Sequence, residues 1–132
     1  MAKTLAVIFG VVFLLIGLGG FVVNPLVGAH ALFETDTTHN VIHLVLGAVL
    51  LVVGLLAGAR AALWLKIIGA ITLILGMLGL LGGDTLLGIA VNNGADTWLH
   101  FILGAVLLAA GFLTKGEAAP PMIAATPPST HL

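Results

Sequence analysis

The chain has very little charge for its length. Of its 132 residues, 7% are charged and 61% are hydrophobic, whereas about a quarter of the residues in an ordinary soluble domain are charged. A globule of this size cannot bury so much apolar surface within itself. We therefore expect most of the chain to lie in a lipid bilayer.

Several residue types that carry chemistry are also missing. The chain has no cysteine, which excludes a disulfide framework, a thiolate metal site and a cysteine nucleophile. Its one serine, Ser129, lies near the C-terminus, and no nucleophile–base pair, phosphate loop or pair of catalytic carboxylates stands out. The four basic residues are scattered, so no basic stripe indicates nucleic acid. We expect neither an enzyme nor a nucleic-acid-binding protein.

Four long apolar runs predict four membrane-spanning helices. We expect these helices over residues 5–23, 39–58, 63–81 and 96–114, each near the roughly 20 residues needed to cross a bilayer. Asn24-Pro25 should end the first helix, and Asp96 or Thr97 should cap the fourth. Residues 1–115 then form one all-α transmembrane domain, a four-helix bundle. Residues 116–132 form a Pro/Ala-rich cytoplasmic tail, predicted to be disordered.

The distribution of charge predicts the orientation of the bundle. The basic residues fall on one side of a four-span topology and most acidic residues on the other; they are Lys3, Arg60, Lys66 and Lys115 against Glu34, Asp36, Asp84 and Asp96. Basic residues are retained in the cytoplasm. We therefore expect a multi-pass protein of the plasma membrane with both termini cytoplasmic.

Two stretches of the sequence are closely similar to each other. Residues 43–56 read HLVLGAVLLVVGLL and residues 100–113 read HFILGAVLLAAGFL, with nine of the fourteen positions identical. Gly10 and Gly17 align with Gly69 and Gly76 in the remaining two helices. The chain is thus predicted to be two tandem helical hairpins, a parallel internal repeat about an axis along the membrane normal.

Glycines recur seven residues apart in all four predicted helices. Seven residues return to nearly the same helix face, and small residues allow close helix packing in lipid. The glycines concerned are Gly10, Gly17, Gly47, Gly54, Gly69, Gly76, Gly104 and Gly111. They are interpreted as packing stripes within the bundle, with homo-oligomer contacts or room for a flat cofactor as alternatives.

Histidines near the starts of the second and fourth helices are the candidate functional residues. An ionisable group in a membrane span is a functional candidate. His43 and His100 could tie the hairpins together by hydrogen bonds or be the two axial ligands of a haem. Alternatively, His39 and His43, four residues apart on one helix face, could bind a metal with Asp36. These interpretations stay open, and no cofactor is predicted outright.

The same segments carry a family resemblance. Residues 38–43 (THNVIH) followed by Leu46-Gly47, and residues 98–100 (WLH) followed by Leu103-Gly104, resemble a family of small bacterial four-helix membrane proteins catalogued as a domain of unknown function. The resemblance covers about residues 5–114. It implies a bacterial plasma membrane and four spans, and it brings no activity or ligand.

Three functions compete on these grounds. The leading interpretation is a structural or accessory subunit, a scaffold that associates with itself or with a larger membrane complex through its glycine-lined helices. The alternative is a haem- or metal-binding module that uses the paired histidines in electron transfer. The third is a small-solute carrier, weakly favoured by the parallel repeat.

Overall fold

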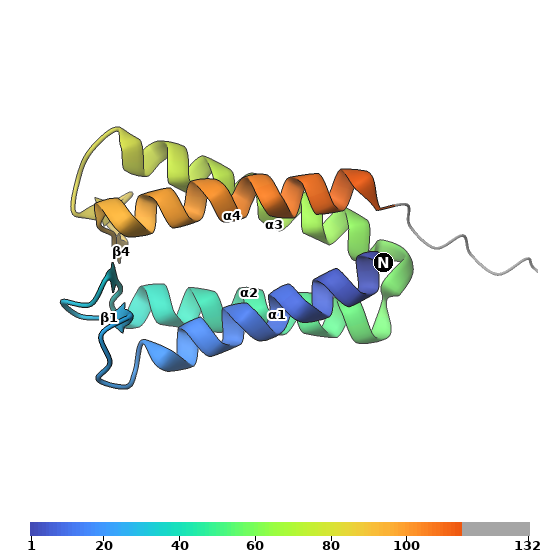
Figure 1. Cartoon of the computed structure of the whole chain (residues 1–132), viewed down its shortest axis with the longest axis horizontal. Coiled ribbons are helices and arrows are strands. Elements are labelled where there is room, and N and C mark those ends of the chain that lie inside the picture. The colour runs from blue at the N-terminus through green and yellow to red at the C-terminus, as the bar shows by residue number, and fades with distance from the viewer. Residues whose placement is uncertain (115–132) are drawn as a thin grey trace, which may run out of the picture.

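A computed structural model describes residues 1–114, and these form an all-α bundle (Figure 1). The helices are α1 (Ala2–Gly19), α2 (Thr37–Leu56), α3 (Ala61–Leu80) and α4 (Gly94–Leu113), with a short 3-10 turn η1 (Gly58–Arg60) before α3. Four helices are each long and apolar enough to cross a membrane. The prediction of an all-α protein with four helices able to span a membrane is confirmed. Lys115 and the predicted tail lie outside the described residues.

The helices form two hairpins. α1 packs along α2 and α3 packs along α4, while the two pairs make fewer contacts with each other. The N-terminus and the α2–α3 turn lie at one end of the bundle, which we call the turn end (Figure 1). The α1–α2 and α3–α4 loops lie at the opposite end, which we call the loop end (Figure 1).

Each loop contains a pair of two-residue strands, which no pattern in the sequence predicts. β1 (Val27–Gly28) and β2 (Phe33–Glu34) pair in parallel, and β3 (Thr85–Leu86) and β4 (Ala90–Val91) pair antiparallel. Two residues are too few to give an alternating pattern of side chains. The β3–β4 loop folds over the loop end of the bundle, where Leu86 and Ile89 line a cavity between the hairpins.

The first helix ends four residues before the position predicted from Asn24-Pro25. α1 ends at Gly19, and the Asn24 side chain donates back to the Gly19 carbonyl at 2.9 Å while its oxygen accepts from the Leu26 and Val27 amides. Residues 20–24 are therefore held in a turn by Asn24 and do not continue the helix. Side-chain bonding of this kind competes with helical hydrogen bonds.

The cap of the fourth helix was predicted at the wrong residue. Asn93 is the N-cap of α4, and its side chain accepts from the Asp96 amide at 2.9 Å. In the first hairpin Asp36 plays the same part, accepting from the His39 amide at 2.8 Å. Asp96 therefore lies in the first turn of α4, and its side chain does not cap the helix.

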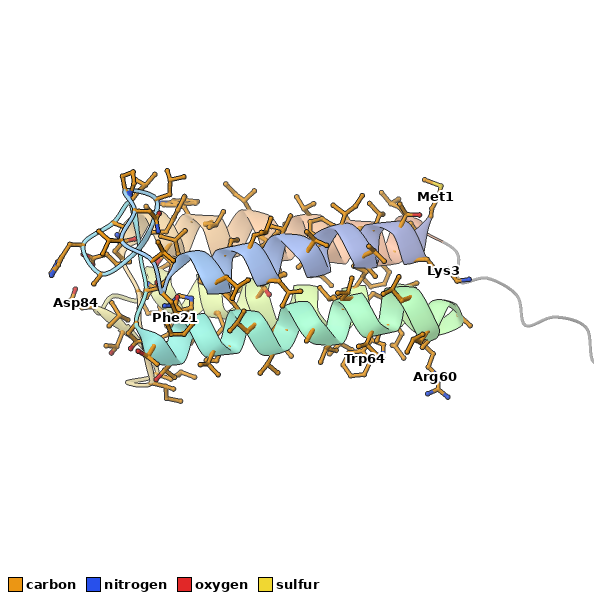
Figure 2. All side chains as sticks on the ribbon, turned by 90° about the horizontal axis from the view of Figure 1, so that it is seen from below. Met1, Lys3, Phe21, Arg60, Trp64 and Asp84 are labelled. Atoms are coloured by element: carbon orange, nitrogen blue, oxygen red, sulfur yellow. The ribbon has the colours of Figure 1, made fainter. Side chains whose placement is uncertain are left out.

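The outer surface of the bundle is apolar along the helices and charged at its ends. Leu15, Val45 and Ile102 are among many large hydrophobic side chains that lie exposed on the helices. Lys3 and Arg60 lie at the turn end and Asp84 at the loop end (Figure 2). An apolar flank between charged ends fits a lipid bilayer.

Candidate metal centre

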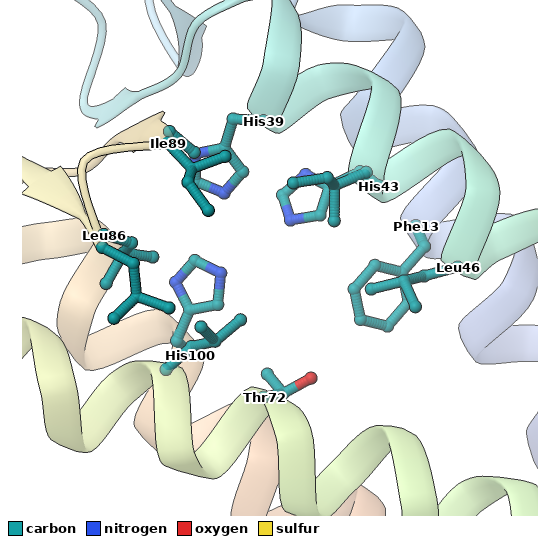
Figure 3. Close-up of a pocket in the computed structure, with 12 residues that line it drawn as sticks. Phe13, His39, His43, Leu46, Thr72, Leu86, Ile89 and His100 are labelled. Carbon is teal, nitrogen blue, oxygen red and sulfur yellow. The ribbon is translucent and has the colours of Figure 1, made fainter.

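Three histidines from both hairpins meet near the loop end. His39 and His43 are one turn apart on α2, so their side chains share a face, and His100 faces them from α4. All three are buried, with 2%, 5% and 6% of their surface exposed. A ligand nitrogen from each lies within 4.8 Å of the others, and the rings are turned toward one another (Figure 3).

Hydrogen bonds determine which nitrogen is available on two of the rings. The Nδ1–H of His39 donates to the Val91 carbonyl and the Nδ1–H of His100 donates to the Asp96 carbonyl, both at 2.8 Å. Because a carbonyl can only accept, the proton must be on Nδ1. Each Nε2 then keeps a lone pair, which is how metal-binding histidines are usually held.

The third ring has an unpaired nitrogen. His43 lies between His39 and Phe13, with ring centroids 4.6 Å and 5.5 Å away. Its Nδ1 is buried without a hydrogen-bond partner. Leaving a buried polar atom unpaired costs about 1–3 kcal/mol, so a ligand for this nitrogen would be stabilising.

A buried carboxylate accompanies the cluster. Asp96 is 1% exposed, and its two oxygens lie 3.6 Å from the Nδ1 atoms of His39 and His100. The Oδ2 atom has no hydrogen-bond partner. A negative charge beside two ligand rings would raise their basicity and offset the charge of a bound cation.

The rings border a small cavity between the hairpins. Its volume is about 90 Å³, and apolar side chains such as Phe13, Leu46, Leu75 and Ile89 make up most of the remaining wall. Pockets for drug-sized ligands measure about 300–1,000 Å³. A haem macrocycle between His43 and His100 does not fit this space, whereas a single ion with a small ligand does.

Sequence comparison places the chain in a family. A family model described as "Domain of unknown function (DUF4383)" matches residues 3–113. The chain belongs to this family. Neither the curated proteins nor the solved structures gave a match. The resemblance noted from the sequence is confirmed, and since DUF4383 carries no assigned activity, the function has to be argued from the geometry.

Asp36, predicted as a third metal ligand, is used elsewhere in this DUF4383 chain. Its Oδ1 accepts from the His39 amide at 2.8 Å and its Oδ2 from the Val91 amide at 3.2 Å. It thus caps α2 and ties the α3–α4 loop to the first hairpin. The structure gathers His39, His43 and His100, a set that contains both residues of the predicted haem pair and both histidines of the predicted metal site.

The seven-spaced glycines face the partner helix of their own hairpin. A Cβ on Gly10 would lie 2.7 Å from the Leu51 nitrogen, and one on Gly76 would lie 2.6 Å from the Phe101 nitrogen. The same holds for Gly17, Gly47 and Gly54 against α1 or α2, and for Gly69, Gly104 and Gly111 against α3 or α4. Gly47 and Gly104 therefore provide close backbone contact and do not line the cavity.

Proposed function

We propose that this protein binds one divalent transition-metal ion through His39, His43 and His100. The observation that carries the proposal is the convergence of three buried imidazoles from two hairpins within 4.8 Å. Imidazole nitrogen suits zinc, copper, iron and nickel. The proposal is one of binding and includes no catalysed reaction.

Small ring movements would bring the nitrogens into coordination. A metal–nitrogen bond of about 2.0–2.1 Å in a tetrahedral site separates the ligand atoms by about 3.4 Å. Ring centroids of 5.3 Å for His39–His100 and 6.0 Å for His43–His100 leave a gap between α2 and α4 for an ion. The bound ion would then link the two hairpins.

Charge near the site supports a divalent cation. The Asp96 carboxylate lies beside two of the rings, and Asp36 lies at the start of the same turn as His39. A buried cation needs such partners because desolvation strongly disfavours an uncompensated charge. Two carboxylates match the charge of one divalent ion.

The arrangement of the glycines and the size of the cavity favour metal binding over the scaffold and carrier functions. The glycine stripes that would have served a partner are occupied inside each hairpin, so a scaffold or homo-oligomer would have to use the lipid-facing surface. The cavity that contains the histidines is small and lies among apolar side chains. We therefore put metal binding ahead of the other two.

The orientation is part of the proposal. Lys3 and Arg60 lie at the turn end with the N-terminus and Asp84 lies at the loop end (Figure 2), and basic residues are retained in the cytoplasm. We take the protein to sit in a bacterial plasma membrane as two tandem hairpins of one duplicated unit, with both termini inside. The metal site would then lie near the outer surface.

The test is metal binding by the full chain, purified in detergent without a histidine tag and stripped with a chelator. Titration with Co²⁺ should saturate at one ion per chain and give visible absorption bands. His39→Gln, His43→Gln and His100→Gln should each abolish tight binding.

His30→Gln is the matched control, because this side chain is 96% exposed in the α1–α2 loop. It should bind Co²⁺ like the unaltered protein. Wild-type binding by His100→Gln would reject the three-histidine site, and so would an absence of bound ion in the unaltered protein.

A further inference from the structure

The three histidines leave an open coordination position. Tetrahedral metal sites need four ligands, and sites with three protein ligands keep the fourth for a small molecule. Among residues 1–114, the group that gathers within ligand distance contains only these three histidines. Asp96 is the nearby carboxylate, but it lies beside the Nδ1 edges of His39 and His100, away from the lone pairs on Nε2.

The space beside the open position is small, and its wall is apolar apart from the histidines and Thr72 (Figure 3). Phe13 and Leu46 lie beyond His43, and Leu86 and Ile89 of the α3–α4 loop line the side near His39 and His100 (Figure 3). The cavity measures about 90 Å³, well below the roughly 300–1,000 Å³ of pockets for drug-sized ligands. It therefore has room for an ion and a small molecule.

The charge around the site is already balanced without another ligand. With the carboxyl groups of Asp36 and Asp96 both ionised, a divalent ion held by three neutral imidazoles would sum with them to zero. The basic side chains Lys3 and Arg60 lie at the opposite end of the bundle (Figure 2). An anionic fourth ligand would leave a net negative charge among apolar side chains, which is costly, whereas an uncharged ligand adds none.

We propose that the metal holds a small uncharged molecule in its fourth position, in preference to an anion. This inference rests on the proposed metal site and names the class of ligand that the site takes. It follows from three features together: three protein ligands, an apolar cavity of restricted volume and a charge balance that is already complete.

Nitric oxide and azide separate the two ligand classes. The full-length protein in detergent is loaded with Fe²⁺ without oxygen and exposed to nitric oxide, and a second sample is loaded with Co²⁺ and titrated with azide. We expect a stoichiometric iron–nitrosyl adduct by visible and electron paramagnetic resonance spectroscopy, and an unchanged Co²⁺ spectrum in azide.

Each other outcome is informative. Bound Fe²⁺ without a nitrosyl adduct would overturn the open position, and an azide-dependent shift of the Co²⁺ bands would overturn the preference for an uncharged ligand. In both cases the metal site itself would stand. Failure to bind either ion would instead reject the proposed function.

A variant that fills the cavity tests its role. Ala90 is buried in the cavity wall on β4, and Ala90→Leu adds three carbon atoms there. Because overpacking opposes the ligand, nitric oxide affinity should fall by about 5- to 150-fold, while Fe²⁺ binding is retained. Ala48→Leu, on an exposed position of α2, is the matched control and should leave nitric oxide binding unchanged.

A second variant covers the case in which Ala90→Leu does not fold. Leu46→Ala removes cavity wall without adding bulk, and it should allow the Fe²⁺ protein to bind ethyl isocyanide, a larger uncharged ligand that the unaltered protein excludes. Equal isocyanide binding by both proteins would show that the cavity does not limit the ligand, and would overturn the size argument.

Discussion

His39 and Asp96 occupy equivalent positions in the two copies of the repeat, and the structure brings them to 3.6 Å from each other. Each lies four residues before the histidine that begins the repeated stretch. Two histidines here would add a fourth ring and no charge, and two aspartates would leave uncompensated negative charge. One of each would provide the proposed site with a ligand and with a carboxylate to balance the ion.

Asp96→Asn is therefore expected to weaken Co²⁺ binding by about 10–100-fold, the usual effect of removing a group that supports ligand histidines. The amide keeps the size of the carboxylate but loses its charge. Isothermal titration or competition with a chelator measures the change. Asp84→Asn, an exposed carboxylate of the α3–α4 loop, is the control and should leave the affinity unaltered. Equal affinities for both variants would mean that Asp96 does not act on the ion.

At the scale of elements, each hairpin depends on close helix contact at glycine. On α4, Gly104 faces the backbone of Leu73, while Gly94 has no atom near the place a Cβ would occupy. Because the two glycines lie on the same helix, comparing their substitution by alanine distinguishes the effect of steric contact from that of helix propensity. Small residues act in this way because helix association in lipid depends on van der Waals packing.

Gly104→Ala is expected to destabilise the protein by about 1–3 kcal/mol, the usual cost of overpacking. Gly94→Ala should be neutral or slightly stabilising, because alanine favours a helix over glycine by about 1 kcal/mol. Unfolding in mixed micelles with increasing dodecyl sulfate compares the two. A Gly104→Ala protein as stable as Gly94→Ala would show that α3 and α4 can separate without loss.

At the scale of the whole molecule, polar links between the hairpins gather at the loop end. His39 donates to the Val91 carbonyl, the Val91 amide donates to Asp36, and the Asn93 side chain donates to the Leu32 carbonyl at 3.0 Å. These bonds hold the α3–α4 loop against the first hairpin, where the loop lines one side of the cavity. The side of the membrane on which this end lies would decide the compartment that supplies a metal to the proposed site.

The absence of cysteine makes that orientation directly testable. Asp84→Cys at the loop end should react with a membrane-impermeant maleimide in intact cells, whereas Arg60→Cys at the turn end should react only after the membrane is opened. Basic residues retained in the cytoplasm give this expectation. Labelling of Arg60→Cys alone in intact cells would reverse the orientation and move the metal site to the cytoplasmic side.

Composition and local pattern determined the membrane environment, the number of helices and the family. A span depends on a run of about 20 apolar residues, and each run is continuous in the sequence. The same local logic put His39 and His43 on one face of α2, because four residues make about one helical turn. Short-range side-chain bonds decided the ends: Asn24 turned the chain after Gly19, and Asn93 took the cap from Asp96.

Only the tertiary structure decided how the candidate site is composed. The contact of His100 with His39 and His43 depends on how two hairpins pack, and no spacing along the chain encodes that packing. In the folded chain Asp36 caps α2 and accepts a hydrogen bond from the α3–α4 loop, and Asp96 lies beside the rings. The packing also turned the glycines toward their own hairpin partners. Residues far apart in sequence become neighbours because many side chains along each helix face pack together at once.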